Sequence, residues 1–419
     1  MRKKVRVGVV GVGRGMSFAR GAGDLVGMEL VALCDTWEEK LREADQAFAA
    51  QGRRVATYTD YDEFLAHDMD AVILANYFHE HAQFAIQALK AGRHVMSETS
   101  ACITLALGVE LIETVEKTGL IYMFAENYPY MVFNQEMRRL YQAGKVGAFQ
   151  YGEAEYVHPA DAEFWNRISP GLNHWRNWIP ATYYCTHAMG PVMYITDTRP
   201  VKVNGFVIPL AADDPVPARA VRQNDAASMI ALRMDSGAVV KLLQVHLRGH
   251  GVWVRIHGSR GLMENLRCGS RSMLHVVREQ YYERRTGPVE QIYQPDFPHH
   301  RAQATRAGHG GGDFFMNHEF AQAIRTNTPP FLDVYRGVAM SIVGILAYRS
   351  ALADSAPLEV PDFRKKAARD KYRRDHWNPD PTQRKKGDPW PSILGEVKPT
   401  RQGLAYARKI WKRIGYGGQ

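Results

Sequence analysis

The sequence has no cysteine pattern of a disulfide-stabilised or zinc-binding protein. Its four cysteines lie far apart, with no C-x-x-C pair, at Cys34, Cys102, Cys185 and Cys268. This spacing gives neither a disulfide framework nor a paired zinc ligand set. The histidine pairs at residues 79–81 and 299–300 have no third ligand at a suitable spacing. We therefore expect reduced thiols and no metal site.

Long apolar runs are also missing. No stretch of 18 or more apolar residues occurs in the 419-residue chain, as a transmembrane helix would need. The basic start Met1-Arg-Lys-Lys4 leads directly into a strand pattern, without the apolar segment and cleavage site of a signal peptide. We expect no membrane partner and a cytoplasmic location. The length is sufficient for two domains with their own cores.

A net positive charge is missing outside the C-terminal tail. Residues 361–419 hold 16 Lys and Arg against 6 Asp and Glu, a net charge of +10, so the first 360 residues carry −1 of the total of +9. The tail also contains five prolines between residues 379 and 399. This pattern favours a solvated extension, or an arm packed on the protein's surface or on a partner subunit. It argues against a nucleic-acid partner.

What the sequence does contain is a glycine-rich motif, Val7-Gly-Val-Val-Gly-Val-Gly-Arg-Gly-Met16. Val5–Val10 predicts a buried strand, and a helix-forming run over 16–26 follows the glycines. A strand, glycines and a helix in this order are typical of a dinucleotide site, although a plain strand-to-helix turn is the alternative. Glycines let the backbone approach a pyrophosphate at the helix N-terminus. The cofactor-binding candidates of this loop are Gly11, Gly13, Arg14 and Gly15.

The next predicted strand favours the dinucleotide interpretation. Glu29-Leu-Val-Ala-Leu-Cys-Asp35 ends in a carboxylate 24 positions after Gly11. An acid near this distance accepts hydrogen bonds from the adenosine ribose, and its charge repels a 2′-phosphate. Asp35 therefore predicts NAD. NADP is less favoured, although Arg14 could still reach a phosphate.

Strand and helix patterns alternate through the first third of the chain. Strand candidates at 71–75, 93–97 and 120–125 are separated by amphipathic runs at 80–90 and 105–117. Strands separated by helices predict a parallel, doubly wound sheet. Ligands bind at the carboxyl ends of such strands. This position adds four cofactor-binding candidates: Asn76, His81, Glu98 and Asn127.

The pattern changes near residue 148. Strand-like runs with short turns, at 149–157, 201–208, 228–234, 239–246 and 252–257, predict a mostly antiparallel sheet. Helical periodicity returns at 313–326 and 334–352, and we expect these helices to pack back on the first domain. The predicted fold is an α/β Rossmann-type domain with a doubly wound parallel sheet (1–147), then an α+β domain with a mostly antiparallel open sheet (148–363). A basic, extended C-terminal arm (364–419) follows.

The glycine loop, His81 and Ala88-Leu-Lys-Ala-Gly-Arg-His-Val95 together make residues 5–127 resemble the nucleotide domain of the Gfo/Idh/MocA oxidoreductases. Dehydrogenases of this family continue with Glu-Lys-Pro, whose lysine helps move a proton, where this chain has Glu98-Thr99-Ser100. Their Asp-x-Gly-x-His-x-x-Asp motif is here Tyr183-Tyr-Cys-Thr-His-Ala-Met-Gly190. The histidine is kept, but tyrosine and glycine replace the two acids. Both losses argue against ordinary net dehydrogenation.

One branch of the family matches these departures. Tyr184-Cys-Thr-His-Ala-Met-Gly-Pro191 is similar to the Tyr-Pro-Thr-His-Gly-Leu-Gly-Pro segment of the NAD-dependent α-N-acetylgalactosaminidases. Gly308-His-Gly-Gly-Gly-Asp-Phe314 is similar to their Gly-His-Gly-Gly-x-Asp-Phe, and residues 333–335 and 361–363 also fit. The resemblance covers most of residues 5–363. It implies glycoside hydrolysis with a tightly held NAD that is reduced and reoxidised within each turnover.

The residues are compatible with that chemistry. Oxidising a ring hydroxyl acidifies the neighbouring C–H, so the glycosidic group can be eliminated before water adds and the hydride returns. Such a cycle needs groups that move protons and donors that hold the sugar. Tyr184 and His187, at i and i+3 on one predicted helix face, are our first catalytic candidates, and His309 is the next. The substrate-binding candidates are Trp175, Arg176, Tyr183 and Asp313.

The leading hypothesis is an NAD-dependent enzyme that acts on a carbohydrate or glycoside by hydride transfer in a redox-neutral cycle. A net sugar or cyclitol dehydrogenase with His187 as its base is one alternative. A non-catalytic nucleotide-binding protein, in which the histidine and tyrosines are structural, is another. We expect a homo-oligomer, either a dimer or a tetramer.

Overall fold

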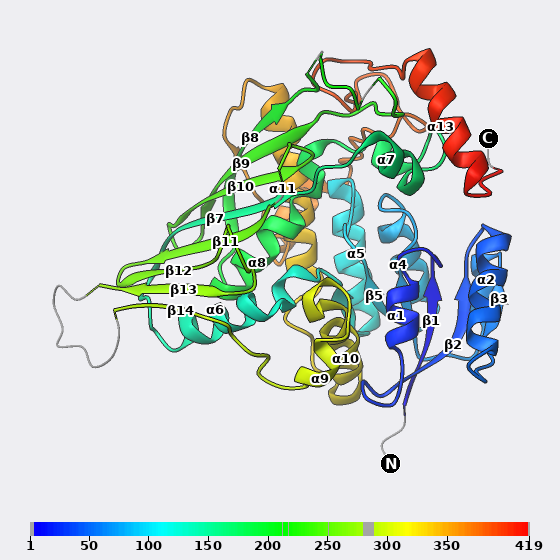
Figure 1. Cartoon of the computed structure of the whole chain (residues 1–419), viewed down its shortest axis with the longest axis horizontal. Coiled ribbons are helices and arrows are strands. Elements are labelled where there is room, and N and C mark those ends of the chain that lie inside the picture. The colour runs from blue at the N-terminus through cyan, green and yellow to red at the C-terminus, as the bar shows by residue number, and fades with distance from the viewer. Residues whose placement is uncertain (1–3, 212, 217, 250, 280–288, 418–419) are drawn as a thin grey trace. The chain divides into compact units, whose positions relative to one another are not determined.

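The computed structural model describes residues 4–211, 213–216, 218–249, 251–279 and 289–417 (Figure 1). The chain forms two compact units. The first contains the described residues up to Leu140, with Gln294–Ser341 and Asp362–Arg374, and the second contains Tyr141–Tyr293, Ile342–Pro361 and the described residues from Asp375 onward. Residues 294–341 and 362–374, which we had placed beyond the first domain, thus belong to the same unit as the Rossmann sheet. The first three residues, used above to look for a signal peptide, lie outside the described residues.

The first unit is built on a parallel six-stranded sheet with the order β3-β2-β1-β4-β5-β6. The order reverses beside β1, as in doubly wound nucleotide-binding folds, so this part of the predicted fold class is confirmed. Its elements are β1 (Val5–Val10), α1 (Met16–Gly21), β2 (Met28–Cys34), α2 (Glu38–Ala49), β3 (Ala56–Tyr58), α3 (Tyr61–Ala66), β4 (Ala71–Leu74), α4 (His81–Lys90), β5 (His94–Ser97), α5 (Leu105–Thr118), β6 (Tyr122–Phe124), η1 (Tyr128–Tyr130), α9 (Arg301–Ala304), η4 (His309–Gly311), α10 (Gly312–Thr326) and α12 (Lys366–Tyr372). Two helices run from one unit into the other, α6 (Val132–Gln142) and α11 (Val334–Leu352).

Local sequence signals explain where these elements begin and end. The Thr104 hydroxyl accepts the N–H of Leu107 at 3.2 Å and starts α5, which ends at Gly119 with φ of 65°. A threonine N-cap and a left-handed glycine are the usual ends of a helix. The run at 16–26, by contrast, forms a helix only as far as Gly21. Gly21 and Gly23 lower the helix propensity of this short segment.

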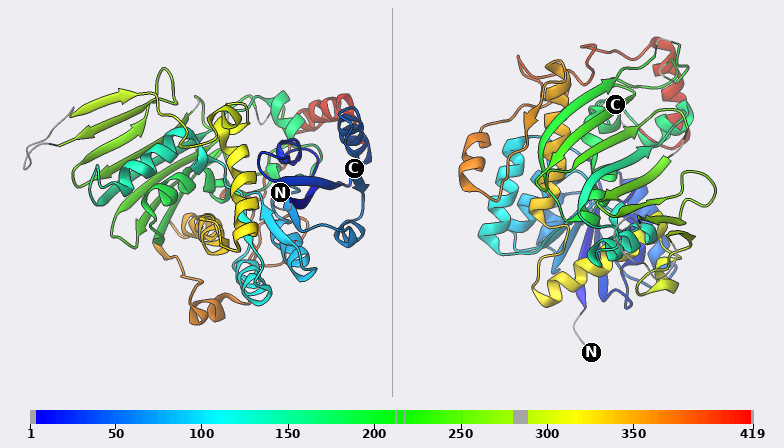
Figure 2. Two further views of the ribbon diagram at one scale, coloured as in Figure 1. Left: turned by 90° about the horizontal axis from the view of Figure 1, so that it is seen from below. Right: turned by 90° about the vertical axis from the view of Figure 1, so that its left-hand side faces the viewer.

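The second unit is built on a nine-stranded sheet with the order β14-β13-β12-β11-β7-β10-β9-β8-β15. Both views of Figure 2 show these strands side by side as one twisted sheet. Among the described strands of this sheet only the β7–β10 pair is parallel, so the mostly antiparallel open sheet is confirmed. The elements are β7 (Phe149–Val157), α7 (Ala162–Ile168), η2 (Trp175–Asn177), η3 (Ala181–Tyr184), α8 (Thr186–Thr196), β8 (Pro200–Ile208), β9 (Ala227–Met234), β10 (Val239–Val245), β11 (Gly251–Gly258), β12 (Gly261–Asn265), β13 (Leu274–Arg278), β14 (Glu290–Tyr293), β15 (Leu358–Glu359) and α13 (Arg401–Arg413). Helix α8 packs on β7, β10 and β11.

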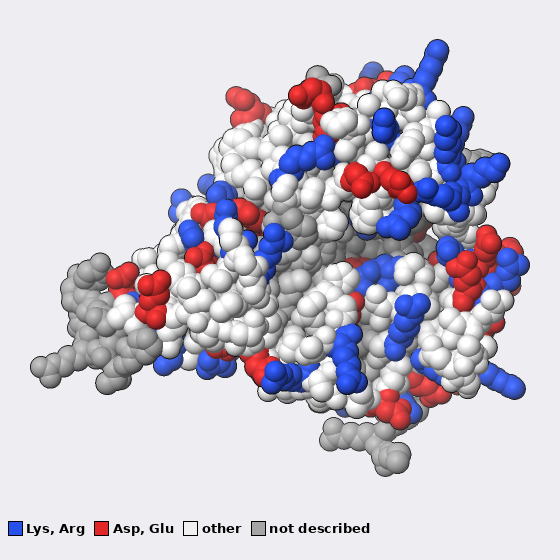
Figure 3. All heavy atoms as spheres, viewed as in Figure 1, with Lys and Arg blue, Asp and Glu red and all other residues white. Residues whose placement is uncertain are grey.

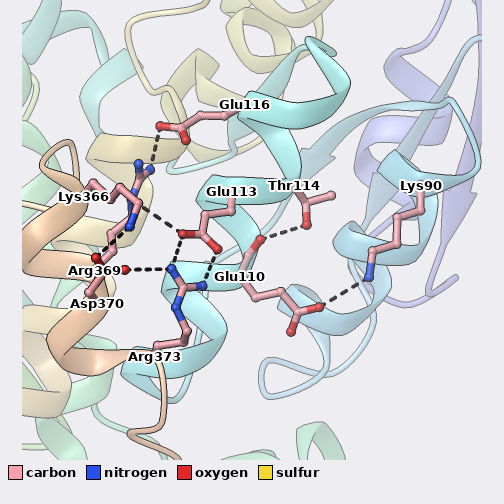
Figure 4. Close-up of polar contacts among 9 residues, drawn as sticks. All are labelled: Lys90, Glu110, Glu113, Thr114, Glu116, Lys366, Arg369, Asp370 and Arg373. Carbon is pink, nitrogen blue, oxygen red and sulfur yellow. Dashed lines mark hydrogen bonds and ion pairs between the residues drawn. The ribbon is translucent and has the colours of Figure 1, made fainter.

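Part of the tail's positive charge is neutralised within the first unit. Figure 4 shows α12 alongside α5, with Arg373 donating to both carboxylate oxygens of Glu113, at 2.6 and 2.7 Å. Arg369 pairs with Glu116 at 2.6 Å, and its side chain is only 9% exposed. A bidentate arginine–carboxylate pair in a network is worth more than an isolated surface ion pair. The first part of the basic tail is therefore bound within the first unit.

The end of the tail packs within the second unit. The indole N–H of Trp411 donates to the Asn166 carbonyl oxygen at 3.0 Å, and Asp225 accepts the Ser392 hydroxyl at 2.6 Å. In α13 the buried positions are Gly403, Ala407, Ile410 and Trp411. Its Lys and Arg side chains are exposed, and Figure 3 shows basic side chains gathered over this part of the molecule. Of the alternatives predicted for the tail, the structure shows an arm that packs on the surface of its own chain.

Replacing Trp411 with phenylalanine should loosen α13. Trp411 is 6% exposed, and the change removes the indole N–H while leaving the buried Asn166 carbonyl oxygen without that donor. We expect a loss of about 1–2 kcal/mol in the free energy of unfolding. Thermal unfolding and limited proteolysis at the C-terminus would measure it. Lys412→Ala, on the exposed face of the same helix, should behave like the wild type, and equal protease resistance of the two variants would contradict the prediction.

Two expectations from composition can be compared with the structure. Cys34, Cys102 and Cys185 are buried and Cys268 is exposed, and all four are free thiols. Among the described residues, every helix is too short or too polar to span a bilayer.

Candidate functional site

The three glycines after β1 differ in what a side chain at each position would meet. Gly11 has φ of +89°, and a Cβ there would collide with the Ala75 carbonyl group of the neighbouring strand connection. At Gly15 a side chain would collide with the Gly11 carbonyl oxygen and Val9. A Cβ on Gly13 meets nothing within 4 Å, so this backbone borders open space. This arrangement lets a pyrophosphate approach the loop.

Asp35 at the end of β2 is held against this loop. Its carboxylate accepts the N–H of Val12 at 2.7 Å and the N–H of Trp37 at 2.9 Å. Burial raises the pKa of Asp35, and these two hydrogen bonds oppose that rise. The carboxylate is therefore fixed beside the glycine loop, where an adenosine ribose lies in this fold.

Polar atoms without partners line the carboxyl ends of the neighbouring strands. Within the described part of the chain, Asn76 Oδ1, Thr99 Oγ1 and Asn127 Oδ1 are buried and have no hydrogen-bond partner. His81 donates its Nδ1–H to the Ser100 carbonyl oxygen at 3.1 Å, and its Nε2 is also buried without a partner. Burial lowers the pKa of His81 to about 4, so its ring is neutral. Buried polar atoms of this kind are rare unless a ligand or water satisfies them, and their positions fit a bound dinucleotide.

Arg14, from the glycine loop, joins two acids of the same unit. Its Nε–H donates to Glu98 at 2.7 Å, and its two terminal nitrogens donate to Asp313 at 2.8 and 3.2 Å. Burial favours a lower pKa for Arg14, but Glu98 and Asp313 outweigh it and raise that pKa. Glu98 and Arg14, predicted as separate cofactor-binding residues, thus form one ion-pair network with Asp313, a predicted substrate-binding residue.

His309 extends this network. Its Nδ1–H donates to the Asp313 carboxylate at 3.0–3.1 Å, and its side chain is 42% exposed. His309, Gly310 and Gly311 have φ values of 51°, 60° and 93°. This left-handed turn is costly for a residue other than glycine. The bond to Asp313 fixes the tautomer, so Nε2 is the ring nitrogen that can accept a proton.

A second group of predicted residues lies in the other unit. The rings of Tyr184 and His187 are 4.9 Å apart, edge to face, and Trp175 stacks on Tyr184 at 5.9 Å. The Arg176 guanidinium lies 4.2 Å from the Trp175 ring centre and 5.9 Å from that of Tyr184. Tyr184 ends η3 and His187 belongs to α8, so the prediction of one shared helix face is wrong. The two rings meet nevertheless.

Tyr156 is a member of this group that the sequence did not suggest. Its ring lies 4.6 Å from His187 and 5.7 Å from Tyr184. It stands on β7, and α8 packs on this strand. Strand alternation could have placed Tyr156 on the same face as Ala154, but nothing in the sequence indicated that α8 covers that face.

Tyr183 has a different environment from its neighbour. It is 2% exposed, and its ring packs edge to face on Tyr348. Gly344 of α11 allows the close approach, because a Cβ there would meet the Thr182 carbonyl oxygen and Tyr183 Cα at 2.7 Å. These contacts are those of a core residue.

The loop that carries Trp175 and Arg176 is firmly held. Asn224 donates to the carbonyl oxygens of Arg176 at 3.2 Å and Ile179 at 2.7 Å. The indole N–H of Trp165 donates to Asn177 Oδ1 at 3.0 Å. Since side chains on a fixed loop lose less entropy on binding, this loop is suited to ligand recognition.

Across the described residues, no group of three or more His, Cys, Asp and Glu could hold a metal ion.

Comparisons with known proteins agree with both units. Residues 5–126 match the family described as the oxidoreductase family, NAD-binding Rossmann fold, and residues 211–370 match the glycosyl hydrolase 109 C-terminal domain. A glycosyl hydrolase family 109 protein of Solibacter usitatus is 26% identical over 390 residues, covering 86% of this chain and 88% of that protein. One from Saccharopolyspora erythraea is 26% identical over 389 residues, covering 86% and 83%.

Solved structures share the fold at lower identity. A levoglucosan dehydrogenase in complex with NADH superposes with a TM-score of 0.72 and 19% identity, covering 86% of this chain and all of that one. An oxidoreductase from Agrobacterium radiobacter, in complex with NAD+, L-tartaric acid and magnesium, has a TM-score of 0.67 and 14% identity, covering 85% and 99%.

Proposed function

We propose that this chain hydrolyses a glycoside in a redox-neutral cycle with NAD, because residues 5–126 match the NAD-binding domain of the Gfo/Idh/MocA oxidoreductase family and residues 211–370 match the glycosyl hydrolase 109 C-terminal domain. The proposal rests mainly on one observation, the contact of the Tyr184 ring with the rings of Trp175 and His187. It joins a tryptophan, which Arg176 covers, to a tyrosine–histidine pair. The chain also has Thr99 where dehydrogenases of the family that it resembles have lysine.

The first unit would hold NAD through the glycine loop, Asp35 and the polar atoms at the strand ends. Gly13 lies next to open space, and Asn76 and Asn127 each have an oxygen without a partner among the described residues. The bound nicotinamide would supply a hydride acceptor that returns the hydride later in the cycle.

Tyr184 and His187 would handle the protons. His187, 7% exposed, is an imidazole with aromatic neighbours on two sides, Tyr184 and Tyr156. It would take the proton of the ring hydroxyl, and the Tyr184 hydroxyl would exchange a proton with the neighbouring carbon or the leaving group. Side chains of this kind act as general acids and bases near neutral pH. His309, oriented by Asp313, is our third catalytic residue.

The decisive experiment is hydrolysis of aryl glycosides by purified protein without added cofactor. We expect release of the aryl alcohol with no net change in NADH absorbance. In a parallel assay with NAD added, steady NADH production in proportion to product, without glycoside cleavage, would instead identify a net sugar dehydrogenase. NAD that survives gel filtration in stoichiometric amount would support internal recycling.

We also propose NAD over NADP as the cofactor. Arg14 is already engaged by Glu98 and Asp313, and the Asp35 carboxylate would repel a 2′-phosphate. Asp35→Ala should weaken NAD binding about tenfold and narrow the NAD to NADP affinity ratio, because it removes ribose hydrogen bonds and that repulsion. Calorimetric titration of both nucleotides would measure this. Asp24→Ala, a matched exposed acid, should leave both affinities unchanged, and tighter NADP than NAD binding by the wild type would refute the proposal.

Two further expectations belong to this proposal. We infer a cytoplasmic enzyme that assembles as a dimer or tetramer, and that binds a small carbohydrate or glycoside. The size of the purified protein, measured by light scattering, would determine the oligomeric state.

A further inference from the structure

Arg176 has an unusual electrostatic position. Among the described residues no carboxylate pairs with its guanidinium, which instead lies over the rings of Trp175 and Tyr184. The side chain is partly buried, and its backbone is fixed by Asn224. A partly buried charge is costly unless it is paired. The structure therefore leaves this cation available to a ligand beside the proposed catalytic tyrosine.

A second arginine lies behind the same loop. Buried Arg222 donates from Nε to Asn224 Oδ1 at 3.3 Å and from Nη2 to the Asp225 carbonyl oxygen at 2.8 Å. Both acceptors are neutral oxygens. Asn224 thus connects the segments that carry the two arginines, because it also donates to the Arg176 carbonyl oxygen. Both cations act on His246, whose pKa is held well below its ordinary value by burial, then by Arg222 and less strongly by Arg176.

The acids nearest to Arg222 are engaged with other groups. Asp214 pairs with Arg248 and accepts the N–H of Val216 at 2.9 Å. Asp225 accepts the Ser392 hydroxyl at 2.6 Å and the N–H of Ile393 at 3.0 Å. Three arginines therefore face two aspartates here, and neither acid contacts Arg176. Within the described part of this unit, the loop keeps an excess of positive charge.

We propose that the substrate is an acidic sugar, whose carboxylate, sulfate or phosphate group is bound by Arg176 with Arg222 behind it. This inference rests on the proposed function in taking the ligand to be a glycoside. A guanidinium pairs with a planar carboxylate or with ester oxygens through two parallel hydrogen bonds. A sugar ring that lies beside Tyr184 would then present its anionic group to Arg176.

A neutral sugar should bind to this site less tightly than an acidic one. Hydroxyl groups can accept hydrogen bonds from arginine, but they leave its buried charge unbalanced. A hydrogen bond to a charged group contributes more to binding than one between neutral groups. The expected preference for an acidic sugar over its neutral counterpart is therefore about tenfold or more.

The test is calorimetric binding to the full-length protein saturated with NAD, using sugar pairs that differ in one group. Galacturonate against galactose, glucuronate against glucose, and the 6-sulfates and 6-phosphates of the neutral sugars form the set. We expect at least one acidic member to bind about tenfold more tightly than its neutral partner. Arg176→Gln should abolish that preference, and Arg176→Lys should retain part of it. Arg167→Gln, an exposed arginine on α7, is the matched control and should keep it in full.

Equal affinity for all acidic and neutral partners, or an acid preference that survives in Arg176→Gln, would overturn the inference. Which anion is preferred separates a sugar acid from a sulfate or phosphate ester. Binding is measured without turnover, so the two proposals fail separately. An acid preference without glycoside cleavage would leave this inference standing and remove the proposed hydrolysis, whereas cleavage of neutral glycosides without acid preference would do the reverse.

Discussion

Replacing His187 with alanine is expected to lower glycoside cleavage by about 10²- to 10⁴-fold, the usual contribution of a positioned general acid–base group. His187 is 7% exposed and touches the rings of Tyr184 and Tyr156. NAD binding should be unchanged, since the residues assigned to the cofactor belong to the other unit. Initial rates with an aryl glycoside and calorimetric titration of NAD would measure both effects.

Two further variants make this result specific. Tyr184→Phe keeps a ring for the stack with Trp175 and removes only the hydroxyl, so a large rate loss would show a chemical role for that group. If Tyr184 and His187 act as a unit, the double variant should lose little more than His187→Ala alone. His376→Ala, at an exposed position in the same unit, serves as the control. Unchanged cleavage in His187→Ala would contradict a catalytic role for His187, whereas no cleavage by the wild type would favour the non-catalytic, nucleotide-binding alternative.

The nucleotide-binding half of the fold could be predicted from the sequence because its signals are local. Each signal spans a short stretch of sequence. Examples are β1 (Val5–Val10) with the glycines that follow it, and the helices with apolar periodicity that end at a glycine. The parallel sheet then follows from the alternation of strands and helices. The parallel pair β7–β10, by contrast, joins strands about ninety residues apart, and no short sequence pattern indicates this pairing.

The partners of the site residues could not be predicted in the same way. Arg14 and Asp313 are 299 residues apart in the chain, and only the folded first unit brings them together. Arg14 was predicted as a cofactor-binding residue because it lies within the glycine loop, yet its guanidinium is directed to two carboxylates. Tyr156 was missed since β-strand alternation gives a face but not the helix that covers it.

The C-terminal tail shows the limit of compositional reasoning. Its charge and prolines suggested an extension, and composition does not distinguish a solvated arm from one that packs on its own chain. The apolar positions of α13, spaced at 403, 407, 410 and 411, form one helix face and were hidden among its basic residues. That face is the signal that could have predicted its packing.

The second large effect is expected from Asp313→Asn. Asp313 is 5% exposed and binds both Arg14 and His309, so its carboxylate balances a partly buried arginine and orients a histidine. Removing the charge should cost about 2–3 kcal/mol in the free energy of unfolding near neutral pH, less than for an isolated buried pair because Glu98 still pairs with Arg14. Glycoside cleavage should also fall, because the His309 tautomer is no longer fixed. Thermal unfolding and initial rates would measure the two effects.

The dependence on pH separates this ion-pair network from simple packing. Burial favours a higher pKa for Asp313, but the hydrogen bonds from His309 and Arg14 outweigh it and lower the pKa. A carboxyl group whose pKa is lower in the folded state stabilises fully above its unfolded pKa of about 3.9 and loses this effect as the pH falls through the folded value. The difference in the free energy of unfolding between wild type and Asp313→Asn should therefore be constant from neutral pH down to about pH 5 and then disappear below about pH 4.

Asp296→Asn, which removes a 55% exposed partner of Arg301 in the same unit, is the control and should cost less than about 1 kcal/mol at every pH. A difference for Asp313→Asn that persists unchanged in acid would mean that shape, and not the carboxylate charge, holds Arg14 and His309 in place.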